Sequence, residues 1–220
     1  MSETLAKKEE YQKEFQFIDL GNSESLNAEK IWITSDTHFG HRRILNLEHR
    51  NRHFLDVEEM DSGMISICNE TVGKNDIIFH LGDFAFAKKE RILEITSQLN
   101  GKIYLVLGNH EKRTPDRNWK ELGFFQAFDV PVIIDEMFIL THEPLSQIPD
   151  GMINIHGHVH GSEDFVTMDT NRCCVCVERN NCVPVDYSFL KNMYYLEKIR
   201  NNPSILTEQY SSSESNLENV

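Results

Sequence analysis

Three apolar runs separated by two helical patterns fill residues 31–107, and this order constrains the fold more than any other feature of the chain. The runs have the length and composition of buried strands, and they cover residues 31–34, 77–81 and 103–107. Apolar residues recur at helical spacing between them, in 60–71 and 92–99. A strand–helix–strand–helix–strand order is typical of a parallel sheet covered by helices.

The ends of the two helices also have recognisable signals. Asp56-x-x-Glu59 predicts a helix start, with Asp in place of the usual Ser or Thr, and Asn100-Gly101 predicts a helix stop. Later apolar runs follow without long helices between them, which predicts a second, mostly antiparallel sheet built from residues 132–134, 138–141, 153–155, 174–177 and 183–185. The predicted fold class is therefore α/β, a two-sheet β-sandwich of mixed parallel and antiparallel strands flanked by helices.

The five cysteines allow two interpretations of residues 173–182. Cys173-x-x-Cys176 with Cys182 nearby could hold zinc, but a fourth ligand at a sensible spacing is missing. We favour a hairpin with its turn at 178–181. An odd number of cysteines without a secretion signal argues against a disulfide framework.

Composition narrows the partners and the location of the protein. The chain has 220 residues and a net charge of −13, which disfavours binding to long nucleic acids but leaves small phosphorylated ligands open. No run of 18 apolar residues predicts a membrane span, and the N-terminus lacks the apolar segment of a signal peptide, so a cytoplasmic location is expected. We predict a polar N-terminal segment (1–29) whose apolar residues pack on the body, one main domain (30–200) and a disordered acidic, Ser-rich tail (201–220).

Seven polar residues in five short blocks carry the functional signal: Asp36, His38, Asp83, Asn109, His142, His158 and His160. Each block adjoins an apolar run, and several blocks lie just past a predicted strand, where ligand sites gather in open α/β sheets. All seven side chains offer oxygen or imidazole nitrogen. This set of ligands suits two divalent cations, and two-metal sites most often hydrolyse phosphate esters.

The five blocks read SDTH (35–38), LGD (81–83), LGNHE (107–111), THE (141–143) and HGHVH (156–160). In this order they resemble the signature of the calcineurin-like metallophosphoesterases, and the resemblance covers about residues 30–190. The longer stretches SDTHFGH (35–41) and HLGDFAF (80–86) are similar to a small bacterial and phage branch of that family. The resemblance implies the four-layer fold of the family, with two sheets between outer helices.

The resemblance also implies roles for the residues. Asp83 would bridge the two ions, Asp36, His38 and His160 would complete the ligands of one ion, and Asn109, His142 and His158 those of the other. Mn²⁺ is favoured by this donor set, with Fe, Zn²⁺ or Ni²⁺ as alternatives. A hydroxide held between the ions would attack phosphorus. His110 would donate a proton to the leaving group.

Substrate contacts are predicted from an arginine cluster, Arg42, Arg43, Arg50 and Arg52, in a chain that is otherwise acidic. Arg43, Arg52 and His41 are the candidate substrate-binding residues, because arginine pairs with phosphate through two parallel donors. Arg52-x-Phe54 also matches an R-P-F motif of the branch. The alternatives are a solvated loop for the arginines and a ligand-orienting role for His41. His80 and His156 are interpreted as buried histidines with hydrogen-bond partners.

The predicted function is a dinuclear-metal-dependent phosphoesterase for a small phosphate ester, with a nucleotide phosphodiester as the favoured substrate. A phosphomonoesterase or phosphoprotein phosphatase is the alternative, and a non-catalytic metal-binding scaffold is a weaker one. The sequence leaves the oligomeric state open.

Overall fold

The computed structural model describes residues 15–18, 28–48, 52–161 and 171–201, and the chain divides into two units, residues 1–186 and 187–220. The strands of the first unit are β1 (Gln16–Ile18), β2 (Ile31–Thr34), β3 (Ile77–His80), β4 (Lys102–Val106), β5 (Gln126–Phe128), β6 (Val132–Ile134), β7 (Phe138–Thr141), β8 (Ile153–His156), β9 (Arg172–Cys174) and β10 (Val185–Asp186). Its helices are α2 (Ile44–Leu47), α3 (Val57–Thr71), α4 (Lys89–Gln98) and α5 (Asn109–Lys112), with 3-10 helices η2 (Lys120–Leu122) and η4 (Val177–Arg179).

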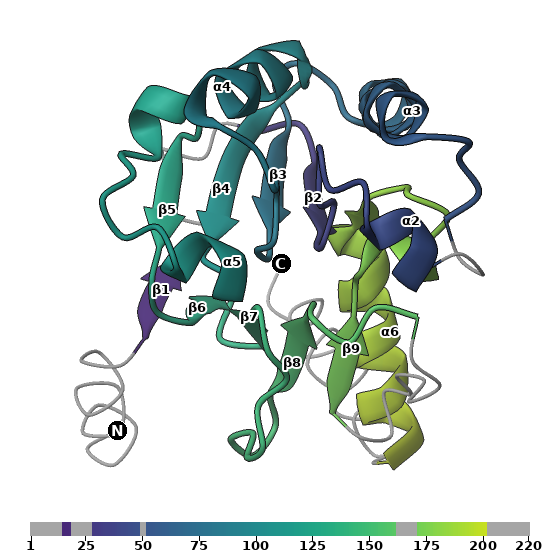
Figure 1. Ribbon diagram of the computed structural model, residues 1–220. Helices are drawn as coiled ribbons and strands as arrows, with labels where there is room; N and C mark the ends of the chain where they lie inside the picture. Colours follow the sequence, from purple (N-terminus) through teal and green to yellow (C-terminus); the bar gives the residue numbers. More distant parts are fainter. Residues whose placement is uncertain (1–14, 19–27, 49–51, 162–170, 202–220) are drawn as a thin grey trace, which may run out of the picture. The chain divides into compact units, whose positions relative to one another are not determined.

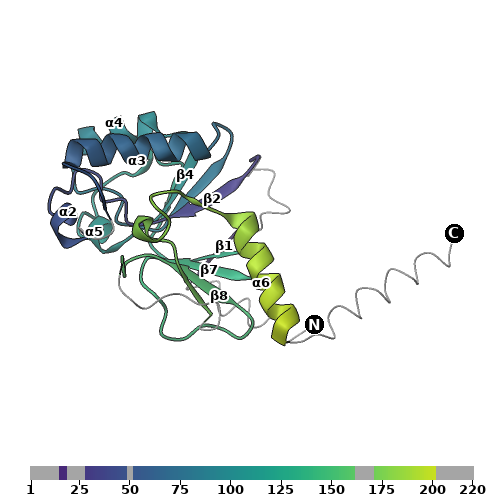
Figure 2. The same ribbon diagram turned by 90° about the vertical axis from the view of Figure 1, so that its right-hand side faces the viewer.

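The first sheet has the strand order β10-β2-β3-β4-β5, and the four strands β2 to β5 are parallel. Helices α3 and α4 cover one face of this sheet (Figures 1 and 2). Met60 of α3 and Ile95 of α4 are fully buried there, in one apolar cluster with Ile78 and Leu105 of the sheet. Each such side chain contributes about 1.5–3 kcal/mol by burial. The predicted parallel sheet with helical cover is confirmed.

The helix boundaries follow the sequence signals. The Asp56 side chain accepts a hydrogen bond from the Glu59 backbone N–H at 2.8 Å, so it caps α3 as predicted. Helix α4 ends at Gln98, and its cap residue Leu99 directly precedes the predicted stop, in which Gly101 has φ +84°. Glycine reaches this left-handed conformation without the steric penalty of a Cβ atom.

The second sheet has the order β1-β6-β7-β8-β9 and differs from the prediction. Only the β6–β7 pair is antiparallel, whereas β1–β6, β7–β8 and β8–β9 are parallel. The prediction of a mostly antiparallel sheet was wrong because the long connections after β7 and β8 return the chain in the same direction. The two sheets form an α/β sandwich of mixed strands flanked by helices, as the predicted fold class requires.

The predicted hairpin at residues 173–182 was also wrong. Strand β9 joins the second sheet beside β8, whereas β10 joins the first sheet beside β2 and is antiparallel to it. The chain between them makes an isolated bridge from Cys176 to Ser35 and then the short helix η4. This segment therefore connects the two sheets and runs past the loop that follows β2.

The ends of the chain bear on two further predictions. In the N-terminal segment, strand β1 includes part of the predicted apolar cluster and pairs with β6, whereas residues 1–14 and 19–27 lie outside the described residues. The predicted tail lies outside the described residues from residue 202 onward. The second unit contains helix α6 (Tyr187–Asn201). None of the helices in the described segments is long and apolar enough to cross a membrane.

Candidate metal centre

The predicted ligands follow the carboxyl ends of parallel strands in both sheets. Asp36, Asp83 and Asn109 come two or three residues after β2, β3 and β4, and His142 and His158 come after β7 and β8. Backbone hydrogen bonds join the first two loops, from Asp36 N–H to the Gly82 carbonyl and from His38 N–H to the Asp83 carbonyl, both at 3.0 Å. The structure thus brings all seven predicted ligands to one edge of the sandwich.

Five of the seven have a left-handed backbone, a conformation that side-chain-bearing residues rarely adopt: Asp36, His38, Asp83, His158 and His160, with φ between 48° and 71°. Such conformations cost of order 1–3 kcal/mol each and cluster at functional sites. The turn after each strand therefore holds its side chain in a strained position, and the surrounding hydrogen bonds must maintain it.

Two glycines allow these turns to approach one another. A Cβ atom on Gly157 would collide with the Ser35 hydroxyl and the Asp36 carboxylate, and one on Gly108 would collide with Asp83. The Gly-His and Gly-Asn pairs of the signature are therefore required by close packing between loops, in addition to any role of the polar residues that follow them.

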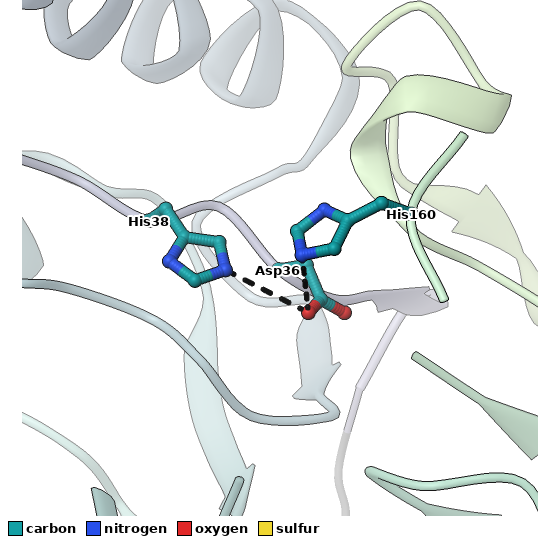
Figure 3. A group of neighbouring side chains, drawn as sticks. All are labelled: Asp36, His38 and His160. Atoms are coloured by element: carbon teal, nitrogen blue, oxygen red, sulfur yellow. Dashed lines mark ion pairs between the residues drawn. The ribbon is translucent and has the colours of Figure 1, made fainter. Parts of the chain in front are cut away.

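The first cluster consists of Asp36, His38 and His160 (Figure 3). Asp36 Oδ1 lies 3.8 Å from His38 Nε2 and 3.6 Å from His160 Nε2. The other carboxylate oxygen, Oδ2, accepts hydrogen bonds from Ser35 Oγ at 2.5 Å and from His158 N–H at 2.8 Å. One oxygen of Asp36 is thus held by protein donors and the other faces two imidazoles.

Asp83 lies between the first cluster and a second group of ligands. Its Oδ2 atom is 3.6 Å from His38 Nε2 and 3.6 Å from His142 Nε2. Its Oδ1 atom accepts a hydrogen bond from the His110 backbone N–H at 3.0 Å. A carboxylate oxygen that faces ligands of both groups is in the position expected of a bridging residue.

The second group is built around His142. Its Nε2 atom lies 2.8 Å from Asn109 Oδ1 and 3.2 Å from His158 Nδ1. Its Nδ1 atom lies 2.8 Å from the Leu81 carbonyl. The Leu81 carbonyl can only accept, so Nδ1 carries a proton. Nε2 faces Asn109 and His158, the two other predicted ligands of this group.

The donors fit divalent cations. Among the described residues, the buried atoms Asp36 Oδ1 and His38 Nε2 have no hydrogen-bond partner, although both point into the first cluster. Buried polar atoms are normally paired, because an unpaired one costs about 1–3 kcal/mol. Burial, and next the positive potential from neighbouring groups such as Arg52, lower the pKa of His38, which favours the neutral ring that a metal ligand requires. Carboxylate, amide and imidazole groups suit Mn²⁺, Fe, Zn²⁺ or Ni²⁺.

Glu111 is a supporting residue to which the sequence reasoning gave no role. Its carboxylate accepts hydrogen bonds from the backbone N–H groups of Asp83 at 2.7 Å, Phe84 at 2.9 Å and Gly108 at 2.9 Å. It therefore ties the loop after β3 to the loop after β4. Burial and the charge of Asp83 raise its pKa, while these three hydrogen bonds oppose that rise. The last position of the LGNHE block was the signal that could have identified it.

His110 lies at the exposed side of the centre. Its Nε2 atom is 3.7 Å from Asp83 Oδ2, and its side chain is 21% exposed. His41 contacts the first cluster through its Nδ1 atom, 3.3 Å from His38 Nδ1, and its ring stacks on Phe86 at 4.8 Å. Phe86 also meets the His110 ring edge-to-face at 5.6 Å. The sequence did not predict a role for Phe86. Its place at the end of the HLGDFAF stretch is only a weak signal.

The arginine cluster does not stay together. Arg42 is exposed and lies 3.7 Å from Glu58, Arg43 is exposed, and Arg50 lies outside the described residues. The guanidinium of Arg52 is fully buried and donates to protein acceptors, which contradicts the prediction that it contacts substrate. Arg43 remains a predicted substrate contact.

The two remaining strand-end histidines are buried as interpreted. His80 Nε2 pairs with the Thr37 hydroxyl at 3.0 Å, and burial lowers its pKa to about 3. Its Nδ1 atom has no hydrogen-bond partner among the described residues, so this histidine is only partly satisfied. His156 Nδ1 lies 2.9 Å from the Gly157 carbonyl. Neither belongs to the groups of converging ligand atoms within the described part of the chain.

Comparison with known proteins agrees with this geometry. A family model described as calcineurin-like phosphoesterase matches residues 29–207. An uncharacterized protein of Methanocaldococcus jannaschii is 32% identical over 183 residues, which cover 79% of this chain and 96% of that protein. The gene 66 protein of Mycobacterium phage L5 is 29% identical over 161 residues, covering 59% of this chain and 76% of the phage protein. A solved structure from Aquifex aeolicus, a protein of unknown function, has a TM-score of 0.58 at 26% identity and covers 74% of this chain and 98% of its own.

The sandwich of two sheets and the converging carboxylate and imidazole groups define a metal-dependent phosphoester hydrolase. Because the family model spans most of the sequence, the chain belongs to the calcineurin-like phosphoesterase family. The resemblance seen in the five sequence blocks is thereby confirmed.

Proposed function

We propose that the protein is a phosphodiesterase that hydrolyses a small nucleotide phosphodiester at a dinuclear metal centre, with Mn²⁺ as the favoured ion. The proposal of two metal ions rests on the position of Asp83. Its Oδ2 atom lies 3.6 Å from an imidazole nitrogen of each ligand group. Asp36, His38 and His160 would hold one ion, Asn109, His142 and His158 the other, and Asp83 both. Two divalent cations supply such a site with an activated water and with positive charge for the phosphate.

The side chains around the centre support a substrate with an aromatic group. His110 is the group placed to give a proton to the leaving oxygen, because its ring reaches the centre and keeps contact with solvent. Phe86 lies against His110 and His41 with 58% of its surface exposed. A nucleobase on the leaving side can stack on such a ring, and stacking on an aromatic side chain is worth about 1–3 kcal/mol per base.

The test is a comparison of substrates with Mn²⁺-loaded protein. We expect a higher kcat/KM on a linear dinucleotide than on the corresponding nucleoside monophosphate. We also expect Phe86→Ala to raise KM on the dinucleotide about 5- to 100-fold, the effect of losing one stacking contact. A glycerol phosphodiester has no aromatic ring, so its KM should be unchanged by the same substitution.

Phe125→Ala is the matched control for this measurement. Phe125 is 47% exposed and directly precedes β5, so it lies at the amino edge of the parallel sheet, opposite the centre. Its replacement should leave both diesters unaffected. A preference for the monophosphate would support a phosphomonoesterase or phosphoprotein phosphatase instead, and equal effects of Phe86→Ala on both diesters would remove the stacking contact from the proposal.

A further inference from the structure

A buried ion pair lies directly behind the first cluster of predicted ligands, Asp36, His38 and His160. Arg52 Nε is 2.7 Å from Glu178 Oε1, and both side chains are fully buried. The two residues are 126 positions apart in the sequence. Removing two charges from water is expensive, and a buried pair is often no more stabilising than apolar residues of the same size. Its contribution to stability therefore does not by itself account for this pair.

Arg52 holds the chain segment that carries two of the predicted ligands. Its guanidinium donates to the Thr37 carbonyl at 2.8 Å and also to the Asp36 carbonyl. Asp36 and His38, the residues on either side of Thr37, both have a left-handed backbone. The arginine thus satisfies backbone acceptors that this strained turn leaves without sheet partners.

Glu178 contacts the opposite side of the same cluster. Its Oε1 atom lies 3.0 Å from His160 Nδ1 as well as against Arg52. Its other oxygen, Oε2, has no partner among the described residues, so its influence on the centre passes through Oε1. A carboxylate at Nδ1 favours the proton on that nitrogen, which leaves the lone pair of Nε2 for a metal ion. Nε2 lies 3.6 Å from Asp36 Oδ1, another predicted ligand of the same ion.

We propose that Glu178, held by Arg52, is a positioning residue that fixes the tautomer and ring orientation of His160 as a metal ligand. The proposal rests on the metal centre and not on the identity of the substrate. It predicts an asymmetry, because His142 in the second group is oriented by the Leu81 carbonyl and does not contact the ion pair. Loss of such supporting carboxylates typically costs 10–100-fold in metal affinity.

The experiment is a calorimetric titration of the metal-stripped full chain with Mn²⁺ alone. Glu178→Gln should weaken one of two binding events about 10- to 100-fold and leave the other unchanged. Because a lone buried Arg52 could prevent folding, the double variant Arg52→Met/Glu178→Met, which removes both charges, is measured beside it. It should show the same weakened event. A folded double variant that binds both ions with wild-type affinity would overturn the proposal.

The control variant Asp76→Asn distinguishes a specific effect on the orientation of His160 from a general loss of protein stability. Asp76 is also a buried carboxylate, and it accepts hydrogen bonds from Trp32 Nε1 at 2.8 Å and Lys30 N–H at 3.0 Å. It directly precedes β3, at the amino edge of the sheet, away from the centre. Its replacement should lower the melting temperature and leave both Mn²⁺ affinities intact. If it weakened Mn²⁺ binding as much as Glu178→Gln at an equal loss of stability, Glu178 would have no specific role.

Discussion

Replacing Asp83 by asparagine is expected to weaken the binding of both metal ions together and to abolish turnover. Asparagine keeps the size of the side chain and its Oδ1 atom, so the hydrogen bond from His110 N–H can persist. The substitution puts an NH₂ group in place of Oδ2, which lies 3.6 Å from both His38 Nε2 and His142 Nε2. Loss of a residue that only supports a metal ligand typically lowers metal affinity 10–100-fold. Loss of a bridging ligand should therefore lower the affinity for each ion by more than about 100-fold.

The measurement is Mn²⁺ binding by titration and elemental analysis, together with hydrolysis of the best diester substrate. Asn109→Ala is the control. Asn109 Oδ1 contacts His142 of the second group, so this substitution should weaken the binding of one ion more than that of the other. Two tightly held ions and normal turnover in Asp83→Asn would show that Asp83 does not bridge. Loss of a single ion in this variant would assign it to one group only.

The first sheet could be predicted from sequence because its signals are local. The strands are short apolar runs, the cap at Asp56 lies three residues from its partner, and the helices between the strands require parallel pairing. The second sheet has no helices to fix its direction. Its parallel pairs β7–β8 and β8–β9 are joined by stretches whose sequence has no helical pattern, so no local signal gives the direction in which each strand returns.

The convergence of the proposed metal ligands could be predicted for a different reason. Each follows a strand end, and the chemistry of the site restricts the residue types that can stand there. Arg52 was placed in the wrong environment because an arginine beside other arginines suggests an exposed basic patch. Its burial depends on Glu178, which lies in a short 3-10 helix far along the chain and has no motif of its own. Contacts of this kind are set by tertiary packing alone.

Replacing His110 by alanine is expected to lower kcat about 10²–10⁴-fold on the nucleotide diester and to leave both metal ions bound. The backbone N–H of residue 110, which donates to Asp83 Oδ1, is retained in the variant. The lost group is the imidazole at the solvent side of the centre, which can hold the proton needed by a poor leaving group. An activated p-nitrophenyl ester leaves without this help, so its rate should fall much less.

The same variant distinguishes the acid from a metal ligand. His110 Nε2 also lies close enough to Asp83 and His38 for these three side chains to share an ion. If His110 were a ligand, His110→Ala would weaken one Mn²⁺ in the titration, and both substrates would lose rate in proportion to the missing metal. If it is the acid, metal binding is unchanged and the loss grows with the basicity of the leaving group. Equal losses on both substrates with both ions still bound would contradict proton donation by His110, because a group that protonates the leaving oxygen must matter most where that oxygen is most basic.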